Sequence, residues 1–185
     1  GAGGGIGRDI ALQLAAAGAC VVVNDIGASL SGEGNDTGPA EAVVREIRAA
    51  GGSAVANTDS IATREGAVRL IGQAVEAIGR IDCVVNNAGI LRDRFFHKMS
   101  DEEWDAVLKV HLYGSFYTSS AAAGFFKEQG GGAFVHMTST SGLVGNRAQA
   151  NYAAAKMNIV GLSRTIAIDL QRSGVTVLDP QRTWV

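Results

Sequence analysis

The chain has 185 residues, of which 46% are hydrophobic and 18% charged, so it is long enough to bury a core and is expected to form one domain. Its formal net charge of −2 argues against the basic surface that nucleic acids and anionic membranes bind. No apolar run approaches the roughly 18 residues of a membrane span, and the Cys and His residues lack metal-ligand spacing. We therefore expect a cytoplasmic protein with no membrane, nucleic acid or metal partner.

Helical and strand patterns alternate along the chain. Ile6, Ile10 and Leu14 recur at helical spacing, and Gly18 ends that helix before a strand over residues 20–24. Further helices are predicted at 39–50, 68–78, 101–127 with a bend, and 152–171, and further strands at 54–57, 81–85, 134–137 and 175–177. Apolar strands that alternate with helices predict an α/β fold in which helices cover both faces of a parallel sheet.

Three local patterns add detail to this prediction. Ser100 and Glu103 form a capping box at the start of the long helix. Cys20 and Cys83 each begin an apolar β-branched run, so we expect both thiols to be buried in the core. The loop over residues 26–38 is rich in Gly, Ser, Asn and Asp and is expected to be a surface excursion.

The chain begins with a glycine-rich turn that runs directly into the first helix. Glycines let the backbone approach a pyrophosphate closely, and the helix N-terminus supplies N–H groups and a positive dipole end. The candidate contacts in this turn are Gly1, Gly5, Ile6 and Gly7. Asp25 ends the next strand, where a carboxylate can accept hydrogen bonds from a ribose diol and would repel a 2′-phosphate. The pattern therefore favours NAD over NADP, although Asp25 alone could be a turn residue.

A hydroxyl, a phenol and an ammonium occur at informative spacing in the second half of the chain. Ser139 precedes Tyr152, and Lys156 follows the tyrosine four positions later. On a helix, Tyr152 and Lys156 share one face about a turn apart, so the ammonium favours the phenolate and makes the tyrosine a plausible general base. Taken singly, the three residues could be a loop hydroxyl, a packing residue and a solvated lysine.

The ordered set of motifs resembles the short-chain dehydrogenase/reductase family along nearly the whole chain. The glycine turn comes first, followed by Asn86-Asn87-Ala88-Gly89 after a strand, then Ser139, and then Tyr152 with Lys156. This resemblance implies a three-layer Rossmann fold with a doubly wound parallel sheet, one NAD(P)-binding domain over residues 1–185, and an active site at the carboxyl ends of the strands. Its strand order, 3-2-1-4-5-6-7, also implies that the two cysteines are too far apart for a disulfide.

The resemblance also implies a role for each motif residue. Tyr152 would exchange a proton with the substrate oxygen while hydride passes between the substrate carbon and the nicotinamide. Lys156 would activate the tyrosine and hydrogen-bond the nicotinamide ribose, and Ser139 would polarise the reacting carbonyl. The other implied cofactor contacts are Asp59, Ser60, Asn86, Ala88 and Gly89.

His111 stands where the family usually has an asparagine that holds a proton-relay water. A neutral imidazole could hold the same water, and its ordinary pKa near ~6.5 would make the relay sensitive to pH. The alternative is that His111 marks a helix bend and has no proton role. His97 and His136 carry no partner motif and are expected to be structural.

Residues 21–27, 86–94, 110–112 and 145–152 most resemble the (3R)-hydroxyacyl-CoA dehydrogenase domain of multifunctional enzyme type 2 and its bacterial relatives. That branch implies NAD-dependent oxidation of a (3R)-3-hydroxyacyl-CoA to the 3-ketoacyl-CoA, in the peroxisome if the source is a eukaryote. A 3-oxoacyl-carrier-protein reductase is the alternative, disfavoured by Asp25 because such reductases usually take NADPH, and another short-chain alcohol or steroid dehydrogenase also remains open. Family members form homodimers and homotetramers through their long helices.

Both ends of the chain depart from the family pattern. The strand that normally feeds the glycine turn is absent, and residues 178–185 replace the Pro-Gly loop and the segment that covers the substrate. We therefore expect this chain to be part of a longer one. If the short ends are real, the alternative is a non-catalytic NAD-binding scaffold subunit.

Overall fold

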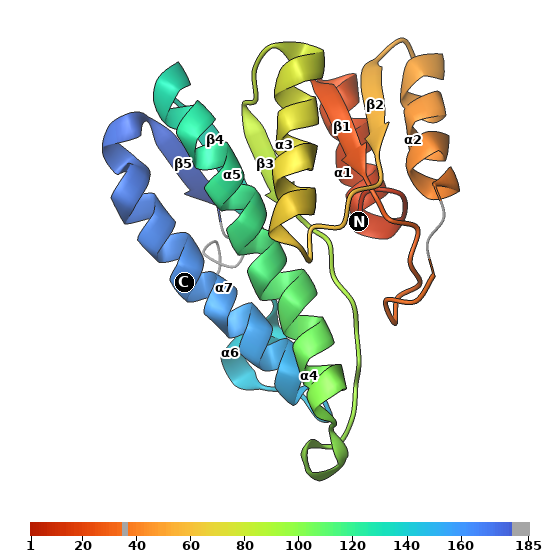
Figure 1. Ribbon diagram of the computed structural model, residues 1–185, viewed down its shortest axis with the longest axis vertical. Helices are drawn as coiled ribbons and strands as arrows, with labels where there is room; N and C mark the ends of the chain where they lie inside the picture. The colour runs from red at the N-terminus through yellow and green to blue at the C-terminus, as the bar shows by residue number, and fades with distance from the viewer. Residues whose placement is uncertain (35–36, 179–185) are drawn as a thin grey trace.

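The computed structural model describes residues 1–34 and 37–178, so the divergent segment after Leu178 lies outside the described residues. Figure 1 shows helices packed around parallel strands. The helices are α1 (Gly5–Ala16), α2 (Gly38–Ala49), α3 (Arg64–Ile78), α4 (Asp101–Leu108), α5 (Gly114–Gln129), α6 (Thr140–Val144) and α7 (Ala150–Leu170). The strands are β1 (Cys20–Asn24), β2 (Ser53–Asn57), β3 (Cys83–Asn86), β4 (Gly132–His136) and β5 (Val175–Leu178). This alternation confirms the predicted α/β Rossmann class.

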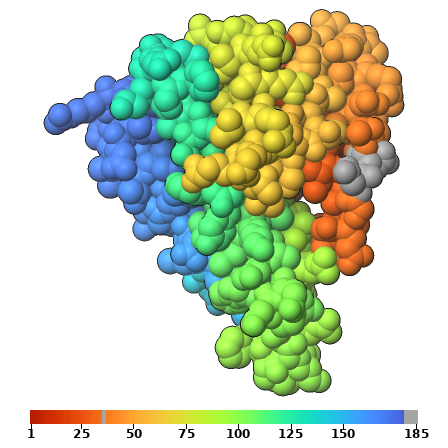
Figure 2. Space-filling model, viewed as in Figure 1, coloured from red at the N-terminus to blue at the C-terminus, as the bar shows by residue number. Residues whose placement is uncertain are grey.

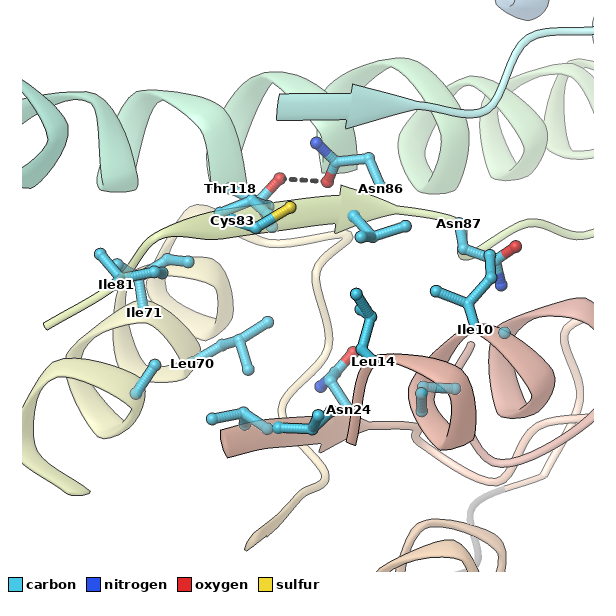
Figure 3. Close-up of a pocket in the computed structure, with 18 of the residues that line it drawn as sticks. Ile10, Leu14, Asn24, Leu70, Ile71, Ile81, Cys83, Asn86, Asn87 and Thr118 are labelled. Carbon is cyan, nitrogen blue, oxygen red and sulfur yellow. Dashed lines mark hydrogen bonds between the residues drawn. The ribbon is translucent and has the colours of Figure 1, made fainter. Parts of the chain in front are cut away.

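The five strands run parallel but form two sheets rather than one. Strand β1 pairs with β2, and β4 pairs with β3 on one side and β5 on the other. Between the facing edges of β1 and β3 lies a cavity of about 410 Å³. Side chains from α1, β1, α3 and β3 surround it, as Figure 3 shows for Leu14, Leu70, Ile71 and Cys83.

The alternation of side chains along β1 places helices on opposite faces of this strand. Val21 and Val23 pack with the core that α1 and α2 cover, whereas Val22 packs with the core beneath α3 and α5. A third, smaller cluster holds Ile90, Val107 and Ala155, and Tyr152 packs against it. The side chain of Tyr152 is thereby supported by core residues from three separate segments.

The prediction that the two cysteines are buried is wrong. Cys20 and Cys83 are free and exposed, and both line the cavity between the two sheets. Each opens a strand whose edge faces this cavity, and no strand among the described residues pairs with that edge. The apolar run that follows is partly covered, but its first residue is exposed.

The long helix predicted over 101–127 is divided by a π-helical turn. Helix α4 begins at the predicted capping box, in which Ser100 Oγ accepts from Glu103 N at 3.2 Å and Glu103 Oε2 accepts from Ser100 N at 3.0 Å. A π-helix over Lys109–Tyr113 then joins α4 to α5. The predicted long helix is therefore interrupted by a π-helical turn, and His111 lies in the middle of this turn.

Within residues 1–34 and 37–178, no helix has both the length and the apolar character that crossing a bilayer demands. The same residues contain no group of three or more His, Cys, Asp or Glu side chains arranged to hold a metal ion.

Candidate active site

The glycine turn lies between the carboxyl ends of β1 and β3. Ala2 N donates to Asn24 O at 3.0 Å, and Asn87 Nδ2 donates to Gly1 O at 2.8 Å. A Cβ on Gly1 would lie 2.8 Å from Ala88 Cα, and one on Gly7 would lie 2.0 Å from Gly1 O. Glycine is required at both positions because the turn packs directly on the segment after β3.

The middle of the same turn is open. A Cβ on Gly4 or Gly5 would meet no atom within 4 Å, and Gly5 has a positive φ of 50°. Helix α1 starts there without a side-chain N-cap, and Ile6 is exposed beside it. Uncapped N–H groups and the positive end of the helix dipole suit an anionic group, so these residues fit the pyrophosphate of a dinucleotide.

Asp25 is held against this turn by two backbone groups. Its Oδ2 accepts from Gly3 N at 2.8 Å and its Oδ1 accepts from Gly27 N at 2.7 Å. A Cβ on Gly3 would approach both the carboxylate, at 3.0 Å, and Pro39, at 2.7 Å. A carboxylate oxygen can accept more than one hydrogen bond, so the fixed Asp25 side chain retains capacity for the hydroxyls of a ribose.

Asp59 lies beside the end of β1, since its carbonyl accepts from Asn24 Nδ2 at 2.9 Å. Asn57 Nδ2 donates to one of its carboxylate oxygens at 2.9 Å and Arg69 Nε to the other at 2.7 Å. Burial acts to raise the pKa of this carboxyl, but the hydrogen bonds from Asn57 and Arg69 outweigh it and lower the pKa. Ser60, next in the chain, accepts from Ala62 N at 3.3 Å.

Helix α7 brings Tyr152 and Lys156 together as the spacing predicted. Lys156 Nζ lies 5.5 Å from the centroid of the Tyr152 ring and donates to Met137 O. The lysine is only 5% exposed, and burial lowers its pKa to about 8. At neutral pH the lysine is therefore close to its pKa, and it lies beside the phenol of Tyr152.

His111 is the third member of this cluster. Its ring meets the Tyr152 ring edge-on, with centroids 5.2 Å apart, and is 3% exposed. Burial, and then the charge of Lys156, lower its pKa to about 4. The expected pH sensitivity near 6.5 is therefore wrong, because the imidazole is already neutral well below that pH.

The hydrogen bonds of His111 involve only one of its two ring nitrogens, among the described residues. Nε2 lies 2.9 Å from Ile90 O and 3.1 Å from Ile90 N, whereas the buried Nδ1 has no hydrogen-bond partner among the described residues. Gly89 makes room for the ring, since a Cβ there would lie 2.4 Å from its Cε1. The π-helical turn sets His111 in this position, and such turns are frequent at functional sites.

Ser139 caps the short helix α6, which the sequence did not predict. Its Oγ accepts from Ser141 N at 3.2 Å. Gly142 then packs on α7, because a Cβ there would lie 2.8 Å from Met157 N and 3.1 Å from Lys156 Cβ. The structure thus carries the predicted hydroxyl on a helix that packs against the turn of α7 that bears Lys156.

Asn151 is a site residue that the sequence analysis missed. It is fully buried, its Oδ1 accepts from Tyr152 N at 2.7 Å, and its Nδ2 donates to Arg92 O at 2.9 Å and Glu103 O at 3.0 Å. It therefore ties the start of α7 to α4 and to the segment after β3. A polar residue directly before the tyrosine was the available signal, but its partners are far away in sequence.

Together these features define the class of the protein. A dinucleotide cradle and a pair formed by the partly buried Tyr152 and the buried Lys156 stand at the carboxyl ends of parallel strands, and residues 1–179 match the short chain dehydrogenase family. The chain belongs to this family of oxidoreductases, as its motifs predicted.

Particular relatives refine this assignment. The peroxisomal multifunctional enzyme type 2 of Mus musculus is 49% identical over 175 residues, which are 95% of this chain and 23% of that enzyme. A hydroxyacyl-CoA dehydrogenase of Mycobacterium tuberculosis is 46% identical over 187 aligned positions, covering 95% of this chain and 56% of that one. The resemblance to this branch is confirmed, and the chain spans little more than half of the mycobacterial relative.

A solved structure agrees with the fold. A 7α-hydroxysteroid dehydrogenase in complex with NADH and 7-oxoglycochenodeoxycholic acid matches 97% of this chain and 66% of its own, with a TM-score of 0.88 and 31% sequence identity. The described residues therefore share the fold of this dehydrogenase.

Proposed function

We propose that this chain carries the catalytic centre of an NAD-dependent oxidoreductase that interconverts a secondary alcohol and a ketone. The observation that carries the proposal is the packing of the buried Lys156 and His111 against Tyr152, on the same sheet edge as the glycine cradle. The NADH-bound structural relative supports a nicotinamide cofactor.

Asp25 supports NAD rather than NADP. Its carboxylate lies against Gly3, where a 2′-phosphate would meet a negative charge, and Gly3 and Gly4 offer no basic side chain to receive one. The remaining contacts proposed for the cofactor come from three places along the sheet edge. They are the turn residues Gly1, Gly5, Ile6 and Gly7, then Asp59 and Ser60, then Asn86, Ala88 and Gly89 with Tyr152 and Lys156.

Side chains of this protein carry out the proton transfer. A bound NAD would supply the hydride acceptor. The Tyr152 phenolate takes the proton of the substrate alcohol and becomes a phenol, and the Lys156 ammonium, anchored to Met137 O, stabilises the phenolate before the transfer. Ser139 is assigned to orient the substrate oxygen.

His111 can serve this chemistry through one nitrogen only. Because Nε2 is engaged by Ile90, only the buried Nδ1 is left to hold a water molecule beside Lys156. With a pKa near 4 the ring would hold that water while neutral, so its contribution would not change between pH 6 and pH 8.

For the substrate we propose a (3R)-3-hydroxyacyl-CoA, which is oxidised to the 3-ketoacyl-CoA. The similarity to a hydroxyacyl-CoA dehydrogenase supports this class. Three arginines that could meet a CoA phosphate already have partners: Arg94 pairs with Glu103 at 2.8 Å, Arg147 stacks on Phe95 at 4.9 Å, and Arg92 lies 3.4 Å from Glu33. We also propose a homodimer or homotetramer, in the cytoplasm or, in a eukaryote, the peroxisome.

The proposal is tested by mixing the protein with NAD and a (3R)-3-hydroxyacyl-CoA and following the absorbance of NADH. We expect turnover that is faster than with NADP and faster than with the (3S) isomer. Turnover only with NADPH and a 3-oxoacyl carrier protein would favour the reductase instead. NAD binding without turnover of any secondary alcohol would leave a scaffold role.

A further inference from the structure

His136 is the last residue of strand β4 and lies outside the cluster of Tyr152, Lys156 and His111. Its side chain contacts two helices. It is 0% exposed. Its Nε2 lies 3.0 Å from Ser119 Oγ on α5, and its Nδ1 lies 2.8 Å from Ser163 Oγ on α7. One imidazole therefore bridges two helices through the strand between them.

The hydrogen bonds continue beyond both serines. On the α5 side, Asn86 Nδ2 donates to Ser119 Oγ at 3.2 Å, and Thr118 Oγ1 donates to Asn86 Oδ1 at 2.6 Å, the bond drawn in Figure 3. On the α7 side, Ser163 Oγ donates to Ile159 O at 2.8 Å. The chain of contacts thus runs from the end of β3 to the interior of α7.

The bond to Ser163 indicates where His136 carries a proton. A serine hydroxyl has one hydrogen, and Ser163 donates its hydrogen to Ile159 O, so it must accept from Nδ1–H. On the other side, Ser119 Oγ lies within hydrogen-bond distance of both Nε2 and Asn86 Nδ2. The arrangement suits an imidazole protonated on Nδ1.

The same strand connects the two parts of the proposed site through its backbone. Met137, next to His136, receives Lys156 Nζ on its carbonyl and donates its N–H to Asn86 O at 3.2 Å. A shift of His136 would therefore move the end of β3 and the anchor of Lys156 together.

We propose that His136 is a positioning residue that keeps the segment 86–89 in register with α7. The inference rests on the proposed function for its kinetic consequence. Its Ser119 side orders Asn86 and hence the segment assigned to the cofactor, and its Ser163 side holds the helix that carries Lys156. Buried polar networks of this kind fix one arrangement because each unsatisfied member is costly.

Nitrogen NMR of histidine-labelled wild-type protein tests the network without any need for activity. We expect Nδ1 of His136, assigned by the loss of its signals in His136→Gln, to carry a proton. A ring protonated on Nε2 alone would overturn the proposal.

Variants of Ser119 and Ser163 test the contact of His136 with α5 separately from its contact with α7. Leaving one buried partner unsatisfied is expected to weaken the affinity for NAD about tenfold in Ser119→Ala, with little change in kcat. Ser163→Ala is expected to lower kcat about tenfold, with a smaller loss of NAD affinity than in Ser119→Ala. Ser53→Ala serves as the control, because Ser53 is exposed and its hydroxyl lies 3.1 Å from the Cys20 thiol.

Substitutions of His136 itself complete the experiment. His136→Phe should show both defects, and His136→Gln, which keeps a donor and an acceptor, should recover part of each. Equal losses in NAD affinity and kcat from both serine variants would indicate general loosening and overturn the proposal. If wild-type protein binds NAD but oxidises no alcohol, the catalytic proposal fails, while the protonation of Nδ1 and the NAD affinities still decide the role of His136.

Discussion

At the scale of single residues, the site is governed by burial around one phenol. Lys156 and His111 are both buried beside Tyr152, and burial pushes the pKa of each toward its neutral form. For His111 the result is a neutral ring at physiological pH. For Lys156, burial makes the protonated form unfavourable, so holding the ammonium in the folded protein costs stability. In return, the charge stabilises the phenolate of Tyr152.

This cost predicts how stability depends on pH. The pKa of Lys156 is about 8 in the folded protein and 10.5 in its ordinary state, so between these values the unfolded chain binds more protons. Stability from this group therefore rises as pH increases from 8 to 10.5, by about 3 kcal/mol in total. Urea unfolding of wild type and Lys156→Met should show their difference in unfolding free energy changing with pH in this window. A difference that is constant across it would contradict the account.

Gly89 offers a second test at this scale. In Gly89→Ala the new Cβ would meet the His111 ring at 2.4 Å, so we expect a loss of about 1–3 kcal/mol and a displaced imidazole. The control is Gly124→Ala in α5, where a Cβ meets nothing and helix propensity should add about 1 kcal/mol. Thermal melting measures the stability of both variants. Equal melting temperatures for Gly89→Ala and Gly124→Ala would contradict this expectation.

The sequence was informative about residues whose roles depend on local spacing. Tyr152 and Lys156 share a helix face because they are four positions apart, and Asp25 directly follows a strand. It could not show that Ile90 engages His111, or that Asn151 reaches Arg92 and Glu103. Those contacts, and the shifted pKa of His111, arise only when distant segments fold together.

At the scale of elements, α4 is the support of the histidine. Its capping box fixes where the helix begins, and the π-helical turn then places His111 against Ile90. Periodicity predicted the helices and strands to within a few residues at most ends. It did not reveal α6, because a five-residue helix is too short to show a period.

Loss of the cap should weaken this support. We expect Ser100→Ala to lower the unfolding free energy by about 1 kcal/mol, because the N–H of Glu103 loses its acceptor. Denaturant unfolding measures this, with the exposed Ser53→Ala as the comparison. A cap that contributes nothing would leave the two variants equally stable.

At the scale of the whole molecule, the divided sheet is the main feature. The edges of β1 and β3 face a largely apolar cavity, and unpaired backbone groups at buried edges are unfavourable. We therefore keep the proposal that residues 1–185 belong to a longer chain. The intact protein from its source should exceed 19.1 kDa in mass, and a measured mass of 19.1 kDa would refute this.

The cavity also predicts thiol reactivity. Cys20 and Cys83 line it and are exposed, so both should react with an aromatic disulfide reagent in the folded 1–185 chain. A longer chain that covers these edges should protect both thiols. Protection of both in the isolated 1–185 chain would show that the cavity is closed in solution.

The central claim is that Tyr152 performs the proton transfer of an NAD-dependent oxidation. The most direct test compares initial rates of NADH formation from a (3R)-3-hydroxyacyl-CoA by wild type, Tyr152→Phe and Tyr113→Phe, an exposed tyrosine. We expect Tyr152→Phe to lose at least about a hundredfold in kcat, the usual scale of general acid–base catalysis, while Tyr113→Phe keeps the wild-type rate. A Tyr152→Phe variant as active as wild type would contradict the account.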